Sequence, residues 1–492
     1  MSQRKRVVVV GAGIAGLSAA ARLASAGYDT VVIEKQSGPG GRAAQATWDG
    51  FTFDLGPTLL FMLDVFRDAF ASWGGDFDRD VPTMRMRPNY RLNFASGQQL
   101  DVSPVLSETI ASLEQLKPGS SQGLLGYLAG GARAYELSMR EFVGKPIRSF
   151  TQFLTVRKIK ALIDAGAFRK LAPAARRAFG SQEIANAFSL QSMYLGMSPF
   201  ASPEMYRLLL YTELGQGIFF PIGGIGALGR ALETAARRNG ADIRYNVEVD
   251  GVEFDGGAAR SLRAGRDRIE ADCVLFTADL PYVYDRLLKE PHHRSTRMRL
   301  TPSALLIYAA LDRGYDDLLH HEFLMPQNLR DTCDDIFDRK RLPEDMAIYL
   351  AAPAKSDPSF APPGGEALYV LVPIPNLLGS IDWERDTEEI TQSVLERIER
   401  RRLPGLRSRI RFYKTRTPRD FATDLNLAHG SAFGLSHDLL QIGPLRPANR
   451  HAKYRNVYFA GASTRPATGL PLVTMSAMQT ADRIMEEVPL HA

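Results

Sequence analysis

The chain opens on a hydrophobic strand pattern followed by a glycine-rich turn. Residues 7–10 are four consecutive valines, and such a continuous β-branched run is typical of a strand buried on both faces of a parallel sheet. A stretch rich in Ala and Leu that ends near Gly27 predicts a helix, and residues 28–33 predict a second strand. The order strand, turn, helix, strand predicts a βαβ unit.

The same two patterns return further along the chain. Residues 227–239 have helical spacing, and a last helix opens at residues 468–471 and continues through Met485. Three more strands are predicted at 243–252, 273–278 and 456–460. Because strands that alternate with helices are typical of parallel sheets covered by helices, the predicted fold class is α/β.

Composition narrows the class of protein without defining its chemistry. Hydrophobic residues make up 45% and charged residues 23% of the chain, as in ordinary globular proteins. The formal net charge of +5 gives little reason to expect nucleic-acid binding. Cys273 and Cys333 form no CxxC set, so we expect neither disulfides nor a metal site. Two isolated cysteines fit best with a protein of the reducing cytoplasm. The histidine pairs 292–293 and 320–321 are expected in solvated loops.

The first turn carries a dinucleotide-binding motif. In the sequence GAGIAG, Gly11 permits the tight turn, Gly13 lets the backbone approach a pyrophosphate, and Gly16 lets the helix pack on the strand. The helix N-terminus supplies N–H groups for the phosphate. Glu34 ends the second strand, eighteen residues after Gly16, which suits a carboxylate that binds a ribose diol. A GxGxxG alone is weak evidence, but the whole unit occurs in order and predicts dinucleotide binding.

Several further motifs resemble one family over almost the whole chain. A second glycine segment, residues 38–42, follows Glu34, as in the flavoprotein superfamily of amine oxidases, protoporphyrinogen oxidase and carotenoid desaturases. The remaining matches are residues 51–58, 220–224, 429–433, 461–464 and 469–471. With these the chain resembles the bacterial phytoene desaturases, which are FAD-dependent carotenoid dehydrogenases. Residues 465–468, Arg-Pro-Ala-Thr, depart from the family's commoner His-Pro-Gly, so the particular oxidation stays open.

The resemblance implies FAD as the cofactor, held by the turn and by the family motifs. The predicted cofactor-binding residues are Gly11, Gly13, Ile14, Ala15, Gly16, Glu34, Lys35, Gly41, Arg42, Gly56, Pro57, Thr58, Val249, Gly461, Gly469, Leu470 and Pro471.

The length of 492 residues exceeds the ~250 to 300 at which one hydrophobic core usually splits. We therefore predict a Rossmann-like FAD-binding domain assembled from residues 1–90, 215–290 and 440–492. An α+β substrate domain with a helical, membrane-facing part would comprise residues 90–215 and 290–440.

Uncharged stretches are the candidates for a channel that holds a long apolar polyene. They span residues 184–203, 214–229 and 466–481, and they contain Tyr194, Phe219 and Phe220 as candidate channel walls, with ordinary core packing as the alternative. Glu183 and Glu213 flank these stretches. Either carboxylate could accept a proton, but a surface or helix-cap role is the alternative, so no catalytic residue is assigned.

Residues 145–177 combine basic and apolar side chains. Nine basic residues stand against one acid, Asp164: Lys145, Arg148, Arg157, Lys158, Lys160, Arg169, Lys170, Arg176 and Arg177. Apolar residues such as Ile159 and Ile163 interleave at helical spacing, which predicts a segment that lies on a membrane surface. A solvated helix that packs its apolar side on the protein is the alternative. We expect a cytoplasmic protein that is peripherally associated with the membrane.

The function expected from the resemblance is FAD-dependent desaturation of phytoene and partly desaturated carotenoids, with quinone or dioxygen as the electron acceptor. The alternatives are a desaturase, isomerase or oxygenase of another polyene, such as diapophytoene or hydroxyneurosporene. A non-catalytic isoprenoid-binding escort is disfavoured because the dinucleotide motif is intact. An amine oxidase is disfavoured because no aromatic cage for a cationic amine is evident.

Overall fold

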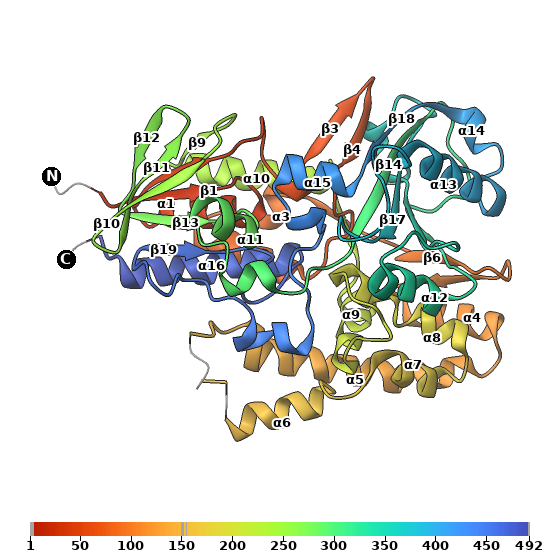
Figure 1. Cartoon of the computed structure of the whole chain (residues 1–492). Helices are drawn as coiled ribbons and strands as arrows, with labels where there is room; N and C mark the ends of the chain where they lie inside the picture. The colour runs from red at the N-terminus through yellow and green to blue at the C-terminus, as the bar shows by residue number, and fades with distance from the viewer. Residues whose placement is uncertain (1–3, 149–151, 154, 491–492) are drawn as a thin grey trace.

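A parallel sheet built from distant parts of the chain forms one end of the molecule. The computed structural model describes residues 4–148, 152–153 and 155–490. Five strands follow the order β19, β13, β1, β2, β9, and every pairing is parallel. Their bounds are β1 (Arg6–Val10), β2 (Asp29–Ile33), β9 (Asp242–Arg244), β13 (Cys273–Phe276) and β19 (Val457–Phe459). Figure 1 shows these segments together on the side where both termini lie.

Both faces of this sheet are covered, which explains the run of valines in β1. Val7 and Val9 pack with three helices, whereas Val8 and Val10 pack with an antiparallel sheet on the other face. The helices are α1 (Ile14–Ser25), α10 (Ile225–Arg238) and α16 (Leu470–Glu487). The antiparallel strands are β10 (Gly251–Asp255), β11 (Ala258–Ala264) and β12 (Asp267–Glu270). The predicted N-terminal strand, helix and second strand are confirmed within one or two residues.

The single strand predicted at residues 243–252 is wrong. The chain leaves the parallel sheet after β9, and β10 belongs to the antiparallel sheet. Between them Asn246 has a positive φ of 57°, and the backbone N–H groups of Asn246 and Val247 donate to the carbonyls of Gln36 and Glu34. This turn wraps around the end of β2, so an alternating pattern concealed two strands with a bend between them.

A seven-stranded, mostly antiparallel sheet forms the other half of the molecule. Its order is β18, β14, β17, β16, β15, β6, β7. The bounds are β6 (Tyr90–Asn93), β7 (Gln99–Val102), β14 (Ser303–Leu311), β15 (His321–Leu324), β16 (Ile348–Ala351), β17 (Glu366–Ile374) and β18 (Ile410–Arg416). Side chains of β14 alternate between the two faces: Leu305 and Ile307 pack toward α13 (Thr387–Arg401), and Leu306 and Tyr308 face the larger central core.

A layer of helices lies below this sheet in Figure 1. It comprises α4 (Leu106–Leu116), α5 (Leu124–Ser138), α6 (Val156–Ala165), α7 (Leu171–Phe179), α8 (Gln182–Ala187) and α9 (Leu208–Tyr211). Within the described ranges, no helix has the length and apolar character needed to cross a bilayer.

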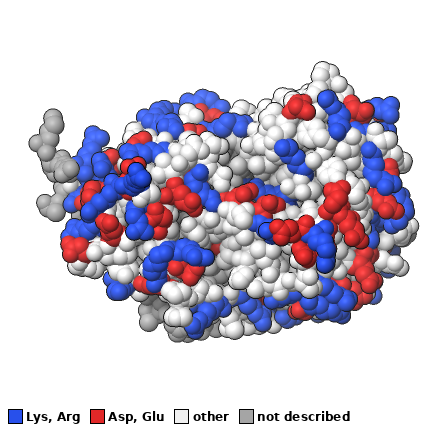
Figure 2. Space-filling view, turned by 45° about the horizontal axis from the view of Figure 1, so that its top comes forward, with Lys and Arg blue, Asp and Glu red and all other residues white. Residues whose placement is uncertain are grey.

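Shorter elements connect the layers. The strands are β3 (Gln45–Trp48) paired with β4 (Phe51–Asp54), and β5 (Thr83–Arg85) paired with β8 (Phe219–Pro221). The helices are α2 (Leu63–Ser72), α3 (Phe77–Asp80), α11 (Leu280–Tyr282), α12 (Leu329–Asp334), α14 (Leu406–Arg409) and α15 (Pro418–Leu425). Over the face seen in Figure 2, Lys and Arg side chains are interspersed with Asp and Glu.

Candidate cofactor and substrate site

Two adjoining cavities lie between the parallel sheet, the seven-stranded sheet and the helical layer. One, of about 330 Å³, begins at the glycine turn after β1, and we call it the cofactor cavity. The other, of about 380 Å³, is lined by the helical layer and the seven-stranded sheet, and we call it the apolar cavity. They share the lining residues Gly56, Pro57, Tyr194, Tyr369, Leu371, Phe433, Thr468, Gly469 and Leu470. A group bound in the first cavity would therefore meet a ligand bound in the second.

The glycine turn opens the cofactor cavity to an anionic group. Gly11 has a φ of 108°, and a Cβ on Gly16 would lie 1.9 Å from the Gly11 carbonyl oxygen, so α1 can approach β1 only without a side chain there. Gly13 precedes α1 without a side-chain cap, and a Cβ placed on it would have 3.8 Å to its nearest neighbour. The free N–H groups of the first helical turn therefore border empty space, as pyrophosphate binding requires.

Glu34 is held in place before any ligand binds. Its side chain is buried, with Oε2 accepting from the Ala12 N–H at 2.7 Å and Oε1 accepting from the Gln36 N–H at 2.8 Å. Each oxygen keeps a lone pair that can accept a bond from a ribose hydroxyl. The neighbouring Lys35 side chain donates to the Thr423 carbonyl and to Asn426 Oδ1, both at 2.9 Å, and so ties this corner to α15.

We expect Glu34→Ala to weaken FAD binding by about 1 to 3 kcal/mol, or roughly 5- to 150-fold, because buried hydrogen bonds to the ribose are lost. Fluorescence titration of the apoprotein with FAD measures this change. Glu34→Gln, which keeps one acceptor oxygen, should lose less. Asp242→Ala, on the exposed part of β9, serves as the matched control, and equal affinities for all three variants would show that Glu34 does not contact the ribose.

Arg42, which is partly exposed, and Asp279, which is buried, form a charged pair on the wall of the cofactor cavity. The Arg42 guanidinium lies 3.8 Å from Asp279 Oδ1, and its Nε is buried without a hydrogen-bond partner among the described residues. Burial lowers the pKa of Arg42, and the Asp279 carboxylate opposes this change. Asp279 also accepts from Ser463 Oγ at 2.7 Å and from the Ala428 N–H at 3.0 Å. An unsatisfied cationic donor in the wall suits an anionic cofactor.

Sequence reasoning missed Asp279 as a site residue, although a signal was present. It follows β13 at the carboxyl end of a parallel strand, where ligands of such sheets bind. Thr277, also missed, lines the same cavity and donates to the carbonyls of Val10 and Gly11.

The structure brings most of the predicted site residues together at the two cavities. Those that line the cofactor cavity alone are Gly11, Gly13, Ile14, Ala15, Glu34, Lys35, Gly41, Arg42, Val249 and Gly461. Gly56, Pro57, Tyr194, Gly469 and Leu470 line both cavities, and Thr58 and Pro471 line the apolar one. Gly16 is absent from both described linings because its role is to pack α1 on the turn.

Phe219 and Phe220 do not line either cavity within the described structure. They belong to β8, whose pairing with β5 turns Phe220 into the core. There its ring contacts His320 at 4.5 Å and Phe360 at 5.7 Å between centroids. The environments of these two residues agree with the alternative interpretation, ordinary core packing.

Glu183 and Glu213 have different environments. Glu183 accepts from Ser96 Oγ at the surface, in agreement with a surface role. Glu213 is fully buried and accepts from the Tyr90 hydroxyl at 2.8 Å and from Gln191 Nε2 at 3.2 Å, so neither alternative role applies to it. Burial raises the pKa of Glu213 to about 8, against the opposing effect of the Tyr90 and Tyr194 hydroxyls and the Gln191 amide.

The apolar cavity presents almost no charge to a ligand. Its described lining contains no Asp, Glu or Lys, and includes Arg465. That guanidinium donates to the carbonyls of Ile147 at 2.6 Å, Pro444 at 2.7 Å and Arg446 at 3.0 Å, so each of its three nitrogens makes a bond to the backbone. The stretch 184–203, expected to border a cavity, contributes Leu190, Met193, Tyr194, Leu195 and Gly196 to the lining. Such a cavity suits a long hydrocarbon.

The fold and the two cavities define a dinucleotide-binding protein that holds an apolar molecule beside its cofactor. A family model described as flavin containing amine oxidoreductase matches residues 14–485. A zeta-carotene-forming phytoene desaturase of Myxococcus xanthus is 40% identical, over 98% of this chain and 94% of its own length. A 4,4'-diapophytoene desaturase of Staphylococcus haemolyticus is 32% identical, over 98% of this chain and 99% of its own.

Solved structures share the fold. Putrescine oxidase bound to putrescine superposes with a TM-score of 0.63 at 16% identity, covering 98% of this chain and 99% of that one. The chain therefore belongs to the flavin-containing amine oxidoreductases, and within them to the carotenoid desaturases. Its cofactor is FAD.

Proposed function

We propose that this chain catalyses the FAD-dependent desaturation of phytoene and of partly desaturated carotenoids. The single observation that carries the proposal is the apolar cavity, which shares Gly56, Pro57 and Tyr194 with the lining of the cofactor cavity. The names of the relatives support a carotenoid-type polyene as the substrate. When bound, FAD supplies the two-electron oxidation.

The protein's own contribution is to position the polyene and to exclude water. We propose that Tyr194, Tyr369 and Phe433 hold the polyene against the flavin, because these three aromatic side chains line both cavities. Of the cofactor-binding residues predicted from the sequence, those that line the cofactor cavity are proposed to contact FAD there. Arg465 bonds to three backbone carbonyls, so the protein itself binds the one charged group of the described wall.

The proposal includes the predicted division of the chain. A Rossmann-like FAD-binding domain would comprise residues 1–90, 215–290 and 440–492, and the substrate domain residues 90–215 and 290–440. Each of the three FAD-binding segments contributes at least one strand to the five-stranded parallel sheet, which supports this division.

The test is to incubate the purified, FAD-loaded protein with phytoene in liposomes and to record the absorption spectrum of the extracted pigment. New visible bands are expected, and their positions report the number of double bonds added. A parallel incubation with diapophytoene separates the alternative substrate. If visible bands form only with diapophytoene, the substrate is diapophytoene and not phytoene. If no bands form with either compound, the proposal is contradicted. Adding a quinone or dioxygen to anaerobic, substrate-reduced enzyme identifies the proposed electron acceptor.

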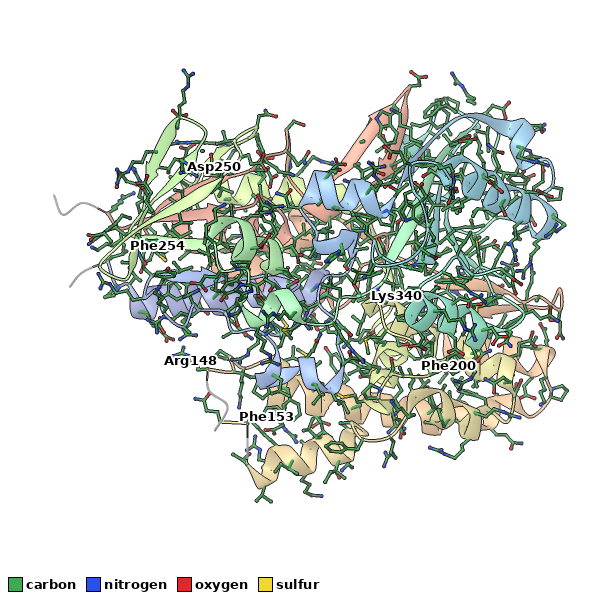
Figure 3. All side chains as sticks on the ribbon, in the orientation of Figure 1. Arg148, Phe153, Phe200, Asp250, Phe254 and Lys340 are labelled. Atoms are coloured by element: carbon green, nitrogen blue, oxygen red, sulfur yellow. The ribbon has the colours of Figure 1, made fainter. Side chains whose placement is uncertain are left out.

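We further propose that the segment 145–177, of which residues 149–151 and 154 lie outside the described residues, docks the protein on the cytoplasmic face of a membrane. On α6, Val156, Ile159 and Ile163 are 86%, 45% and 53% exposed, which is unusual for large apolar side chains close together. The same helix places Leu162 in the wall of the apolar cavity, and Phe153, which precedes the helix, also lines that cavity. Figure 3 shows Phe153 next to α6. A bilayer that covers this face would lie next to the cavity wall.

Basic side chains border this apolar face. Lys160 is exposed on α6 and lies 3.4 Å from Asp164, and Lys158 is partly exposed and donates to the Gln152 carbonyl at 2.8 Å. Both side chains can meet anionic lipid headgroups at this face. Arg157 is less free, because it donates to the buried carboxylate of Glu141 at 2.7 Å. A charge substitution on α6 should therefore spare Arg157, whose loss would leave Glu141 with fewer partners.

We expect the triple change Val156→Ser, Ile159→Ser and Ile163→Ser to lower liposome partitioning by roughly 100-fold, because each exposed side chain contributes about 1 kcal/mol of burial in lipid. Cosedimentation with anionic vesicles measures it. Lys158→Gln with Lys160→Gln should weaken binding mainly at low salt. Ile222→Ser is the matched control, since Ile222 is 45% exposed and precedes α10, which Figure 1 shows away from α6. If the triple variant partitions onto liposomes as the wild type does, α6 does not bind the membrane and is a solvated helix instead.

A further inference from the structure

A chain of hydrogen bonds leads from the wall of the apolar cavity to a buried histidine. Thr58 follows Gly56 and Pro57, which border both cavities, and Thr58 and Tyr349 line the apolar cavity. Thr58 Oγ1 lies 2.6 Å from the Tyr349 hydroxyl, which lies 2.7 Å from His321 Nδ1. The three side chains come from the segment after β4, from β16 and from β15, so the tertiary structure alone assembles them.

His321 is not the solvated loop residue that the sequence suggested. It is 1% exposed on β15, and its ring packs on Tyr349 and His320, with centroids 5.9 and 4.2 Å away. Its Nε2 is buried without a hydrogen-bond partner among the described residues. A buried, unpartnered polar atom costs free energy that an apolar residue would not, and such atoms call for an explanation.

The surroundings keep the His321 imidazole neutral. Burial, and after it the neighbouring His320, lowers the pKa of His321 well below its ordinary value. His320 Nδ1 is hydrogen-bonded to Ser356 Oγ at 2.6 Å, and burial lowers the pKa of His320 to about 3. Burial also raises the pKa of Tyr349 above its ordinary value, so its hydroxyl keeps its proton. With His321 neutral and Nε2 protonated, Nδ1 can accept from Tyr349, and Tyr349 can accept from Thr58.

We propose that Thr58, Tyr349 and His321 form the relay that accepts the proton released in each desaturation, with His321 Nδ1 as its final acceptor. This inference rests on the proposed function and names the proton acceptor that the sequence left unassigned.

The step balances in atoms and electrons. One C–H bond of the substrate breaks and its hydrogen leaves with the electron pair for FAD, which is reduced by two electrons. The C–H bond on the adjacent carbon breaks, and its electron pair becomes the new C=C bond. That proton passes to Thr58 Oγ1 while the Thr58 proton moves to Tyr349 and the Tyr349 proton moves to His321 Nδ1.

A weak base is sufficient for this reaction. Loss of hydride leaves positive charge on the hydrocarbon, which makes the adjacent C–H strongly acidic. A neutral imidazole that is ready at every physiological pH is then better suited than a strong base, because it carries no charge that would disturb the apolar cavity.

The test measures flavin reduction by phytoene in anaerobic single turnovers, in H₂O and in D₂O. Tyr349→Phe keeps the ring and removes the hydroxyl that links the relay. We expect the reduction rate to fall about 100-fold with little change in the substrate concentration at half-saturation. The wild-type solvent isotope effect, which arises from the relay hydroxyls, should disappear in this variant, and a purely structural role would leave it unchanged.

Further variants separate a broken relay from a damaged fold. Thr58→Val should reproduce the loss, and Thr58→Ser, which restores the hydroxyl, should recover most of the rate. Tyr413→Phe is the matched control, because Tyr413 lies on β18 and bonds to Glu388 and Gln392 away from both cavities. Nitrogen-15 NMR of the histidine rings, assigned with His321→Gln, should show His321 protonated on Nε2 in the wild type.

Two failures have different meanings. If the wild-type enzyme forms no product, the proposed function is wrong. If the wild type forms product and Tyr349→Phe keeps the full rate and isotope effect, the relay is wrong. A loss confined to Glu213→Gln would also overturn the relay and assign the proton to that carboxylate instead.

Discussion

Replacing Gly13 by valine is expected to abolish FAD binding while the apoprotein stays as stable as the wild type. The backbone at Gly13 has φ −73° and ψ 179°, a conformation that valine adopts without strain, and a Cβ there would have 3.8 Å to the nearest atom. The added side chain would instead fill the space in front of the α1 N-terminus. We expect an affinity loss of at least about 100-fold, or about 2.7 kcal/mol.

The matched variant is Gly16→Val, three residues further on. There a Cβ would collide with the Gly11 carbonyl oxygen at 1.9 Å, so the apoprotein itself should lose stability. Flavin content of the purified proteins and denaturant midpoints of the apoproteins measure the two effects. A yellow, flavin-loaded Gly13→Val protein would show that the pyrophosphate does not approach this turn.

The second large effect is expected from Arg446→Met. Arg446 is 1% exposed and faces no carboxylate within hydrogen-bonding distance among the described residues. Its guanidinium donates instead to five backbone carbonyls, those of Leu435, Ser436, Gln441, Ala462 and Thr464. These bonds join the segment 435–446 to the segment 462–464 beside the cavities.

Methionine would fill much of the volume and remove the guanidinium donor from all five carbonyls, of which Ser436 keeps a bond from Gln441 Nε2 at 3.3 Å. Because each buried group left unsatisfied costs about 1 to 3 kcal/mol and the structure can relax around some of them, we expect about 3 to 5 kcal/mol of destabilisation. The urea midpoint of the apoprotein measures it. Arg455→Met is the control, since Arg455 donates to the Gly256 carbonyl at the surface. A change below about 1 kcal/mol would mean that water replaces the guanidinium.

The sequence predicted those parts of the molecule whose physics is local. The βαβ unit, Glu34 and the last helix each follow from hydrophobic period, glycine placement and spacing within a few tens of residues. The bend at Asn246 was missed because a strand that changes sheets keeps its alternating pattern. The position of Phe219 and Phe220 outside both described cavity linings could not be predicted, because composition does not tell which side of β8 faces a cavity.

The candidate proton relay illustrates the limit more sharply. Thr58 and Tyr349 are 291 residues apart in the sequence, and Tyr349 and His321 are 28 residues apart. No motif connects the three residues. A histidine pair next to an acidic residue resembles a polar loop until the neighbouring strands of the seven-stranded sheet bury it. Glu213 is similar, because its burial depends on β6 and on the segment around Gln191.

The double role proposed for α6 has a kinetic consequence. One side of this helix carries Leu162 into the cavity wall, and other residues of the same helix stand exposed. An enzyme that takes up its substrate through such a wall would encounter that substrate as a solute dissolved in the plane of the bilayer. Its turnover would follow the mole fraction of phytoene in the bilayer, and adding empty vesicles at constant total phytoene would slow it by surface dilution.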